Sequence, residues 1–360
     1  VDARDGGEVT QPMRHRLRDA CAALLGLVLA SAGIAQAKTF RWSSQGDVTT
    51  LDPHGNNEGV NNHINNMVYE YLVRRDKADF NKFVPGLAVS WTNPAPNTWI
   101  FKLRQGVKFH DGTPFTADDV VFSFDRALAS TGTFSLYSRQ AGKARKIDAH
   151  TVEFVAEVPN PVMMTTLVTL MVVSKSWCER NGVTRAVDFR RNEESYASRH
   201  SMGTGPYILV SREPGVKIVH RKNPEWWGIR EGLYSGNADV IEYRPISNAA
   251  TRMAALKSGE LDFVLDPSLQ DVLRLRNDPA IRIWEGEEFR VLFIGFDQGR
   301  TELQYSDVKS RNPFKDRRVR MALYQAIDIN AIKSQVMRGM SVPTGLPWPG
   351  GRAIGLPPET

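Results

Sequence analysis

The chain has 360 residues, of which 41% are hydrophobic and 24% are charged, a composition typical of a soluble globular protein. Its 46 basic and 40 acidic side chains give a formal net charge of +6. Because the basic residues are dispersed along the chain and form no runs, this charge argues against a nucleic-acid-binding function.

The N-terminal region has the pattern of a secretory signal peptide over residues 13–37. Basic residues follow Met13, residues 20–30 form an apolar core too short to span a bilayer, and a small-x-small cleavage site ends at Ala37. We therefore expect cleavage after Ala37 and a periplasmic location for the mature protein. The polar residues 1–12 are interpreted as an extension of the gene prediction.

The sequence after Ala37 predicts no transmembrane helix, because no segment is apolar for 18 residues. Cys21 lies inside the predicted signal peptide and not directly after its cleavage site, which argues against a lipid anchor. Cys178 is then the only cysteine of the mature chain. We expect it to be a small buried apolar side chain rather than a nucleophile.

The mature chain begins with a predicted strand at 40–43, followed by Leu51-Asp52-Pro53 and a polar loop. A helix is predicted over 60–72, because apolar side chains recur on one face. This apolar face contains Ile64, Met67, Val68 and Tyr71. The opposite face carries four asparagines that we expect to be solvated, namely Asn61, Asn62, Asn65 and Asn66.

The pattern over residues 85–128 predicts a strand, a turn, a second strand, a turn and a helix. Residues 99–104 alternate apolar and polar side chains, and 107–110 form a short strand closed by an Asp-Gly turn. We interpret His110 and Asp111 as partners for backbone groups at this turn. A catalytic or metal-binding pair is the less favoured interpretation, since adjacent side chains in a strand point to opposite faces.

The helix at the end of this stretch has a predicted start at Thr116. Thr116 and Asp119 fit a capping box, in which each side chain pairs with the other residue's backbone N–H. The apolar face of this helix is expected to contain Val120, Val121, Phe124 and Leu128.

The middle of the chain predicts an alternating strand over 147–158, a buried helix over 162–173 and a charged surface segment over 183–199. A Gly-Thr-Gly-Pro-Tyr motif at 203–207 then leads into a strand, because its glycines permit a tight turn and its proline fixes the strand entry. Neither Lys-Ser/Thr nor a helix follows, so the motif is not a phosphate-binding loop.

A further strand at 216–220 precedes the sequence Asn-Pro-Glu-Trp-Trp-Gly at 223–228. Its two tryptophans, Trp226 and Trp227, are interpreted as packing residues at a turn. Stacking on a ligand is the alternative role for these indoles.

The last predicted elements are a strand at 240–246, a helix at 248–257, a strand at 261–265 and a strongly apolar strand at 290–296. Asp316 is expected to cap a final helix. The apolar stripe of this helix contains Val319, Ala322, Leu323, Ala326 and Ile327.

Three motifs in order, at 85–128, 203–228 and 312–328, resemble the signatures of the family 5 extracellular solute-binding proteins, the peptide/nickel-type substrate-binding proteins of ABC importers. The residues that match the family pattern in the third motif are Phe314, Asp316, Val319, Arg320, Ala322, Ala326, Ile327 and Asp328. The resemblance covers roughly residues 40–350. Because the family is usually longer, it also implies a fragment cut inside its last domain.

The resemblance implies an α/β type II periplasmic-binding-protein fold, with two lobes, discontinuous domains and a hinge. Domain I is expected to combine residues 38–83 and 200–290. Residues 84–199 would form an inserted domain II, and residues 291–360 would begin an incomplete domain III.

The function implied by the resemblance is capture without catalysis. Di- or oligopeptides would bind in the interlobe cleft of a monomer, without a cofactor or metal, and pass to the permease subunits of an ABC importer in the inner membrane. The main ligand-pairing acid of peptide-binding members would lie beyond Thr360. Within this chain the expected ligand contacts are His54, Gly55, Asn56, Asn57, Glu58, Phe134 and Tyr137.

Several alternatives stay open on sequence grounds. The same fold could bind nickel or a metal chelate, an opine, a sugar or haem, and His54 and His63 would make a weak metal site. A sensor that presents its ligand to a membrane receptor has the same sequence features as an import protein. A periplasmic hydrolase is the distant alternative, because no GxSxG, HExxH, CxxC or Walker pattern is present.

Overall fold

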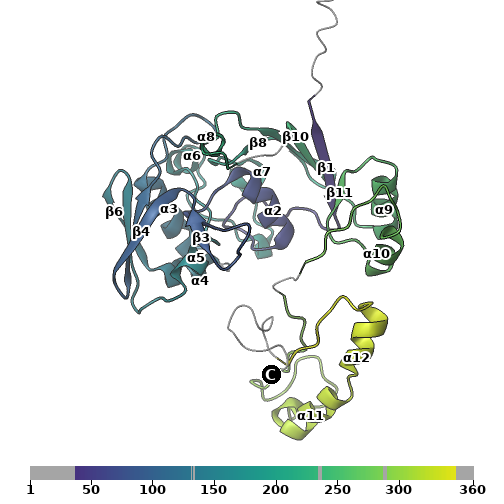
Figure 1. Cartoon of the computed structure of the whole chain (residues 1–360). Coiled ribbons are helices and arrows are strands. Elements are labelled where there is room, and N and C mark those ends of the chain that lie inside the picture. The colour runs from purple at the N-terminus through teal and green to yellow at the C-terminus, as the bar shows by residue number, and fades with distance from the viewer. Residues whose placement is uncertain (1–36, 131, 133, 234–236, 287–289, 346–360) are drawn as a thin grey trace, which may run out of the picture.

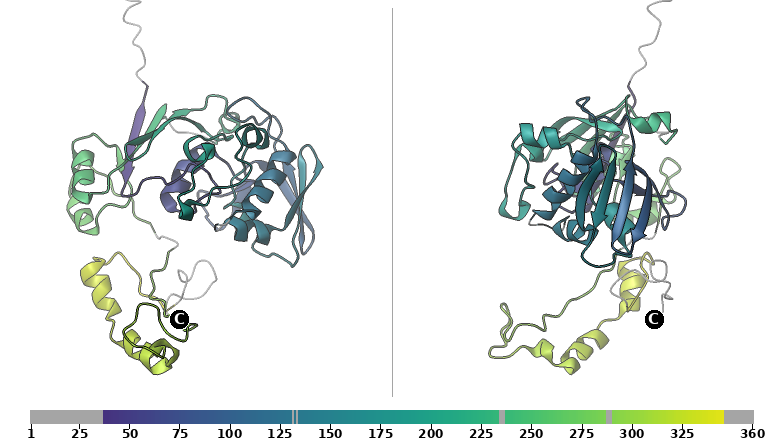
Figure 2. Two further views of the ribbon diagram at one scale, coloured as in Figure 1. Left: turned by 180° about the vertical axis from the view of Figure 1, so that it is seen from behind. Right: turned by 90° about the vertical axis from the view of Figure 1, so that its left-hand side faces the viewer.

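The computed structural model describes residues 37–130, 132, 134–233, 237–286 and 290–345. The predicted extension and, apart from Ala37, the predicted signal peptide lie outside the described residues. The described chain forms two larger β-sheets with helices packed on them and one two-stranded sheet, a mixed α/β architecture. A C-terminal segment lies apart from the two larger sheets (Figures 1 and 2). None of the described helices is long and apolar enough to cross a membrane.

The first sheet has five strands in the order β11-β1-β10-β9-β8. These are β1 (Thr39–Ser44), β8 (Tyr207–Glu213), β9 (Lys217–Lys222), β10 (Val240–Pro245) and β11 (Phe263–Val264). β1 pairs in parallel with β10 on one side and with β11 on the other, although both follow it much later in the chain. The N-terminal strand therefore lies inside a sheet made mostly from residues after 206. Trp42, Leu51, Ile64 and Tyr243 pack together in its core.

The second sheet is antiparallel and has four strands in the order β4-β5-β7-β6. These are β4 (Ala88–Ala95), β5 (Thr98–Leu103), β6 (Lys143–Asp148) and β7 (Thr151–Val155). Helices α3 (Ala117–Leu128) and α4 (Phe134–Ala141) pack against it (Figure 2). A short β-hairpin, β2 (Val73–Arg75) and β3 (Phe83–Pro85), precedes it.

The remaining helices are mostly short. Those before residue 200 are α2 (Gly59–Val68), α5 (Met163–Leu167), α6 (Lys175–Arg180), the 3-10 helix η1 (Phe189–Arg191) and α7 (Tyr196–Arg199). Those after it are α8 (Trp227–Arg230), α9 (Ala249–Lys257), α10 (Leu269–Leu275), the 3-10 helix η2 (Pro313–Lys315), α11 (Arg317–Gln325), α12 (Ile329–Ala331) and the π-helix η3 (Ile332–Val336). Cys178 in α6 is buried as predicted, and burial raises the pKa of its thiol to about 12.

The prediction of one strand over 147–158 is wrong, because this segment contains parts of both β6 and β7. Asp148 Oδ1 accepts the backbone N–H of His150 at 2.8 Å, which reverses the chain in an Asx turn. Since the side-chain alternation continues on both sides of this turn, periodicity alone does not reveal it.

Two further elements are shorter than predicted. The segment 162–173 contains only α5, because the Thr166 and Thr169 hydroxyls donate to carbonyls of the preceding turn and compete with the helical hydrogen bonds. The segment 107–110 is a tight loop with a single β-bridge at Lys108.

Two helix faces also differ from prediction. Asn61 and Asn65 in α2 are buried and not solvated, because the Asn61 amide bonds to the Thr49 side chain and backbone and so holds the segment before the helix. In α3, Leu128 is 44% exposed while Arg126 is buried in its place. Asn61 and Arg126 therefore occupy buried helix faces where they find hydrogen-bonding partners, whereas the Asn65 amide nitrogen is buried without one among the described residues.

The apolar strand predicted at 290–296 is absent. No described strand pairs with this segment, and Phe293 is 75% exposed. The apolar stripe predicted for α11 likewise buries no side chain, although Asp316 caps the helix as predicted by accepting the Arg318 N–H at 2.8 Å. The capping and periodicity signals therefore predict the helix correctly, but no described residue covers its apolar face.

Candidate functional site

The two loops that the sequence analysis selected lie beside each other. The His54 and Phe134 ring centroids are 6.0 Å apart, and the Phe134 and Tyr137 rings follow at 6.4 Å. A Cβ added at Gly132 would lie 3.7 Å from the Gly55 carbonyl oxygen. The fold thus joins the loop after β1 to the start of α4, two segments far apart in sequence.

A buried ion pair holds the first of these loops in place. Arg126 donates from both terminal nitrogens to Asp52, with distances of 2.8 and 2.7 Å to the two carboxylate oxygens. The two side chains are 1% and 0% exposed. Asp52 also accepts the backbone N–H groups of His54 at 3.0 Å and Val187 at 3.4 Å. Burial alone would raise the pKa of Asp52, but the Arg126 charge and these hydrogen bonds hold it below its usual value.

Arg126 joins three separate segments of the chain. It lies near the end of α3, it pairs with Asp52 in the loop after β1, and it donates to the carbonyl oxygens of Val183 at 3.0 Å and Arg185 at 3.1 Å. All these partners are hydrogen-bond acceptors. A planar guanidinium, whose N–H donors form a fixed fork, matches them better than an ammonium group does. Arg126 therefore fixes the relative position of α3, the loop and the 183–187 segment.

Both ring nitrogens of His54 form hydrogen bonds in this arrangement. Its Nδ1 lies 3.2 Å from an Arg126 nitrogen that can only donate, so Nδ1 accepts and Nε2–H donates to the Met171 carbonyl at 2.9 Å. Burial, followed by the Arg126 charge, lowers the pKa of His54 to about 4. A neutral ring with both nitrogens bonded has no lone pair left for a metal. His63, the other histidine of the metal alternative, is exposed, and no three metal-ligating side chains cluster anywhere in the described chain.

The expected contact residues divide into two groups by burial. His54, Gly55, Asn56 and Phe134 are buried, whereas Asn57 and Glu58 are exposed and Tyr137 is half-buried. The buried members shape the loop: a Cβ added at Gly55, for example, would lie 2.8 Å from the Val187 side chain. The side chains left to face a solute are those of Asn57, Glu58 and Tyr137.

The exposed end of the loop leads directly into α2. Glu58 occupies the N-cap position without a side-chain capping bond, and Asn57 Oδ1 accepts a hydrogen bond from the Asn62 amide at 2.8 Å. The exposed end of the loop thus presents a carboxylate and two amides, and the Tyr137 ring follows Phe134 beside the loop. Such a set can recognise a polar solute by hydrogen bonds and an aromatic contact.

Arg126 was not predicted as a residue of this site, although its position in the sequence carries a usable signal. Arg126 follows Ser123 by three positions and Asp119 by seven, and so shares their face of α3, which is buried. An arginine on a buried helix face requires an acidic or carbonyl partner. Asp52 in the Leu-Asp-Pro step was an available candidate for that partner.

A second buried carboxylate, Glu70, holds the two glycine- and tryptophan-containing motifs together. It accepts hydrogen bonds from Trp226 Nε1 at 3.0 Å, Trp227 Nε1 at 2.8 Å and Thr204 Oγ1 at 2.8 Å. Burial raises the pKa of Glu70 to about 7. The indoles are buried and bonded here, and the Arg104 guanidinium lies 4.0 Å from the Trp227 ring centre. Packing, the preferred interpretation, therefore holds for both tryptophans, and Trp226 in addition lines a hollow.

His110 also serves backbone groups in the way that the sequence analysis preferred. Its backbone N–H donates to the Gly203 carbonyl at 2.9 Å, and its ring Nε2 lies 3.0 Å from the Gly205 carbonyl oxygen. The 107–110 loop is thereby fastened to the 203–207 motif.

Comparison with known families assigns most of this chain to one group. The family model described as bacterial extracellular solute-binding proteins, family 5 (middle region), matches residues 82–355. It is a family of solute-binding proteins and not of enzymes.

Individual relatives and solved structures are similar over much of the chain. The dipeptide-binding protein of Escherichia coli K12 is 26% identical, over 92% of this chain and 62% of its own length. A dipeptide-binding protein from Pseudoalteromonas sp. SM9913, solved with Met-Leu, superposes with a TM-score of 0.71 at 22% identity, over 84% of this chain and 59% of that one. MoaA from A. tumefaciens R10, solved with mannopinic acid, gives a TM-score of 0.58 at 29% identity, over 68% and 48%. The chain thus spans about half to two thirds of these proteins, and its fold is of the type II periplasmic-binding class.

Proposed function

Because the chain belongs to family 5 of the bacterial extracellular solute-binding proteins, we propose that it captures di- or oligopeptides in an interlobe cleft. In this proposal the protein works as a monomer in the periplasm and delivers the peptide to the permease subunits of an ABC importer. No bond of the solute is broken. The observation that carries the peptide assignment is the similarity to a dipeptide-binding protein over 92% of the chain.

The candidate loops fit this role physically. Peptides are read mainly through their main-chain N–H and C=O groups, while roomy surroundings tolerate different side chains. Asn57 offers an amide that can pair with either group, and the Glu58 carboxylate can accept from an N–H or pair with an amino terminus. The buried Arg126–Asp52 pair keeps these groups in position before the ligand arrives, which reduces the ordering cost of binding.

The domain division is part of the same proposal. Domain I would combine 38–83 with 200–290 and so contain the five-stranded sheet, and domain II would be the 84–199 insertion with its four-stranded sheet. Residues from 291 onward would contribute to a third domain that closes over the ligand by a hinge motion. This division agrees with β1 pairing between β10 and β11.

Native mass spectrometry of the protein, purified from its host without refolding, tests the peptide assignment. We expect a heterogeneous added mass of a few residues' size that fragments as amino acids. A protein that carries one non-peptide mass, or a nickel-containing mass, would overturn the ligand assignment while leaving the fold intact.

An opine is the second candidate ligand, because MoaA, solved with mannopinic acid, is 29% identical over 68% of this chain. The same experiment separates the two ligands. A single added mass that fragments into a sugar-derived unit and one amino acid supports the opine and contradicts the peptide.

A further inference from the structure

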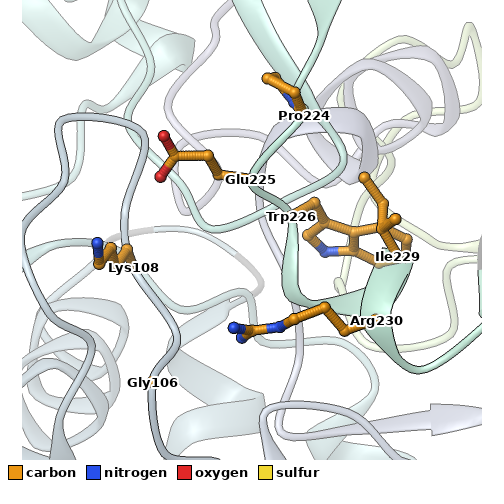
Figure 3. A pocket seen from close by; sticks show the side chains of 7 residues that line it. All are labelled: Gly106, Lys108, Pro224, Glu225, Trp226, Ile229 and Arg230. Carbon is orange, nitrogen blue, oxygen red and sulfur yellow. The ribbon is translucent and has the colours of Figure 1, made fainter.

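A hollow that none of residues 54–58 lines is found where the turn after β5 meets the turn before α8. Figure 3 shows this cavity of about 220 Å³, whose walls include Lys108, Pro224, Glu225, Trp226, Ile229 and Arg230. The charged ends of Lys108, Glu225 and Arg230 lie toward one side of it, and the Trp226 indole and Ile229 form the other side. The hollow thus has a charged side and an apolar side.

The apolar wall is held rigidly from behind. The Trp226 indole N–H donates to the buried Glu70 at 3.0 Å. The indole also folds closely over Gly228, where any Cβ would collide with the ring. Asn223 fixes the start of the turn, because its amide donates to the Gly205 carbonyl at 3.1 Å and its Oδ1 accepts the Glu225 N–H at 3.1 Å. The wall therefore needs no rearrangement to receive a ligand.

The charged side chains that line the hollow form no side-chain hydrogen bonds or ion pairs with any described residue. Among the described residues, the side chains of Lys108, Glu225 and Arg230 form no hydrogen bond or ion pair, and all three are exposed. Two cations against one anion leave a local positive excess, which favours an anionic ligand. Glu225 limits that excess and so favours a singly charged carboxylate over a doubly charged phosphate group.

We propose that this hollow is a second ligand site, separate from the peptide cleft, which takes a small organic monocarboxylate with an apolar tail. The Arg230 guanidinium binds the carboxylate through its parallel N–H donors, and the Lys108 ammonium contributes a second contact. The tail lies along Ile229 and the Trp226 ring. Because the charged groups are exposed and screened by salt, the expected dissociation constant is about 1 mM.

Ligand-observed saturation-transfer NMR with 4-methylpentanoate at low ionic strength tests this site on the full chain. We expect saturable binding across the millimolar range, and none for the neutral analogue 4-methylpentanamide. Arg230→Gln and Lys108→Gln should each weaken binding of the acid about two- to fivefold, the loss expected for an exposed ion pair. Glu225→Gln should strengthen binding, because it removes the repulsive carboxylate.

Arg139→Gln is the matched control, since Arg139 is an exposed arginine of α4 that is remote from the hollow in sequence and absent from its walls. This variant and Tyr137→Ala, which alters the candidate peptide site, should leave binding of the acid unchanged. Three results would each overturn the proposal: no saturable binding, equal binding of the amide, or an equal loss in the Arg230→Gln and Arg139→Gln variants. None of them bears on whether peptides occupy the main cleft.

Discussion

Asp52 and Glu70 are both buried carboxylates that join distant parts of the chain, yet their surroundings differ. Asp52 faces the Arg126 guanidinium, whereas Glu70 faces three neutral donors from Thr204 and two tryptophans. Accordingly the pKa of Asp52 is lowered, while burial raises the pKa of Glu70 to about 7. Neutral dipoles satisfy the oxygens of Glu70 but do not offset the loss of water around its charge, which a full countercharge does.

The two carboxylates also support different parts of the molecule. The Asp52 cluster lies beneath the exposed Asn57 and Glu58, and so it positions the candidate peptide-binding loop. The Glu70 cluster lies behind the Trp226 wall of the second hollow. Each carboxylate thus supports one of the two proposed ligand surfaces, and substitutions can test the clusters separately.

Arg126→Met should give the largest effect, because it leaves Asp52 buried without a countercharge. We expect the free energy of unfolding to fall by about 3–5 kcal/mol, as measured by urea denaturation at neutral pH. Arg139→Met is the control and should change it by less than about 0.5 kcal/mol. A loss in Arg126→Met no larger than in this control would show that the buried pair does not hold the loop.

Glu70→Gln sharpens the comparison through its pH dependence. The folded-state pKa of Glu70 is about 7 and its ordinary value is 4.5, so its stabilising contribution is fully present below about pH 4.5 and is lost as pH rises through 7. The stability advantage of the native protein over Glu70→Gln should therefore shrink between pH 5 and 7.5, by on the order of 3 kcal/mol.

Urea denaturation at several pH values measures this change, with Glu157→Gln as the exposed control. An advantage that grows as pH rises would contradict the raised pKa. It would mean that the two indoles and Thr204 stabilise the ionised form more than burial opposes it.

His54→Gln tests the pH dependence of stability in the Asp52 cluster, where stability is expected to fall as pH falls. The folded-state pKa of His54 is about 4, below its ordinary value of 6.5, so the neutral ring contributes stability that is lost as pH falls from about 6.5 through 4. The native protein should lose on the order of 3 kcal/mol relative to His54→Gln over this range. His63→Gln, at an exposed histidine, is the matched control, and parallel curves for the two variants would refute the assignment of His54.

The sequence predicted the parts of this fold that depend on local patterns. The start of α3, the strand after Pro206 and the helix capped by Asp316 follow from short-range capping, turn and periodicity signals. The position of β1 between β10 and β11 does not, because parallel pairing with residues so far along the chain leaves no trace in local periodicity. The apolar segment at 290–296 makes the converse point, since β-propensity yields a strand only where a neighbouring strand supplies partners.

The candidate site was predictable to a similar extent. The resemblance indicated the loops around His54 and Phe134, and the structure brings them together. Which side chains face outward depends on tertiary burial: residues 54 to 58 are all polar or glycine, yet only Asn57 and Glu58 are exposed. Arg126 was missed because a helical pattern assigns charged residues to solvent unless a partner elsewhere in the chain is recognised.

The smallest expected effects concern the outward-facing residues themselves. Asn57→Ala and Tyr137→Ala should each weaken peptide binding about five- to tenfold, since each removes one hydrogen bond or aromatic contact worth about 1 kcal/mol. Isothermal titration calorimetry with the peptide identified by mass spectrometry measures this loss. Asn66→Ala, which changes an exposed asparagine of α2, should leave affinity unchanged. Unchanged affinity in both site variants would place the solute elsewhere, and would reduce the Arg126–Asp52 pair to a purely structural tie between α3 and the loop after β1.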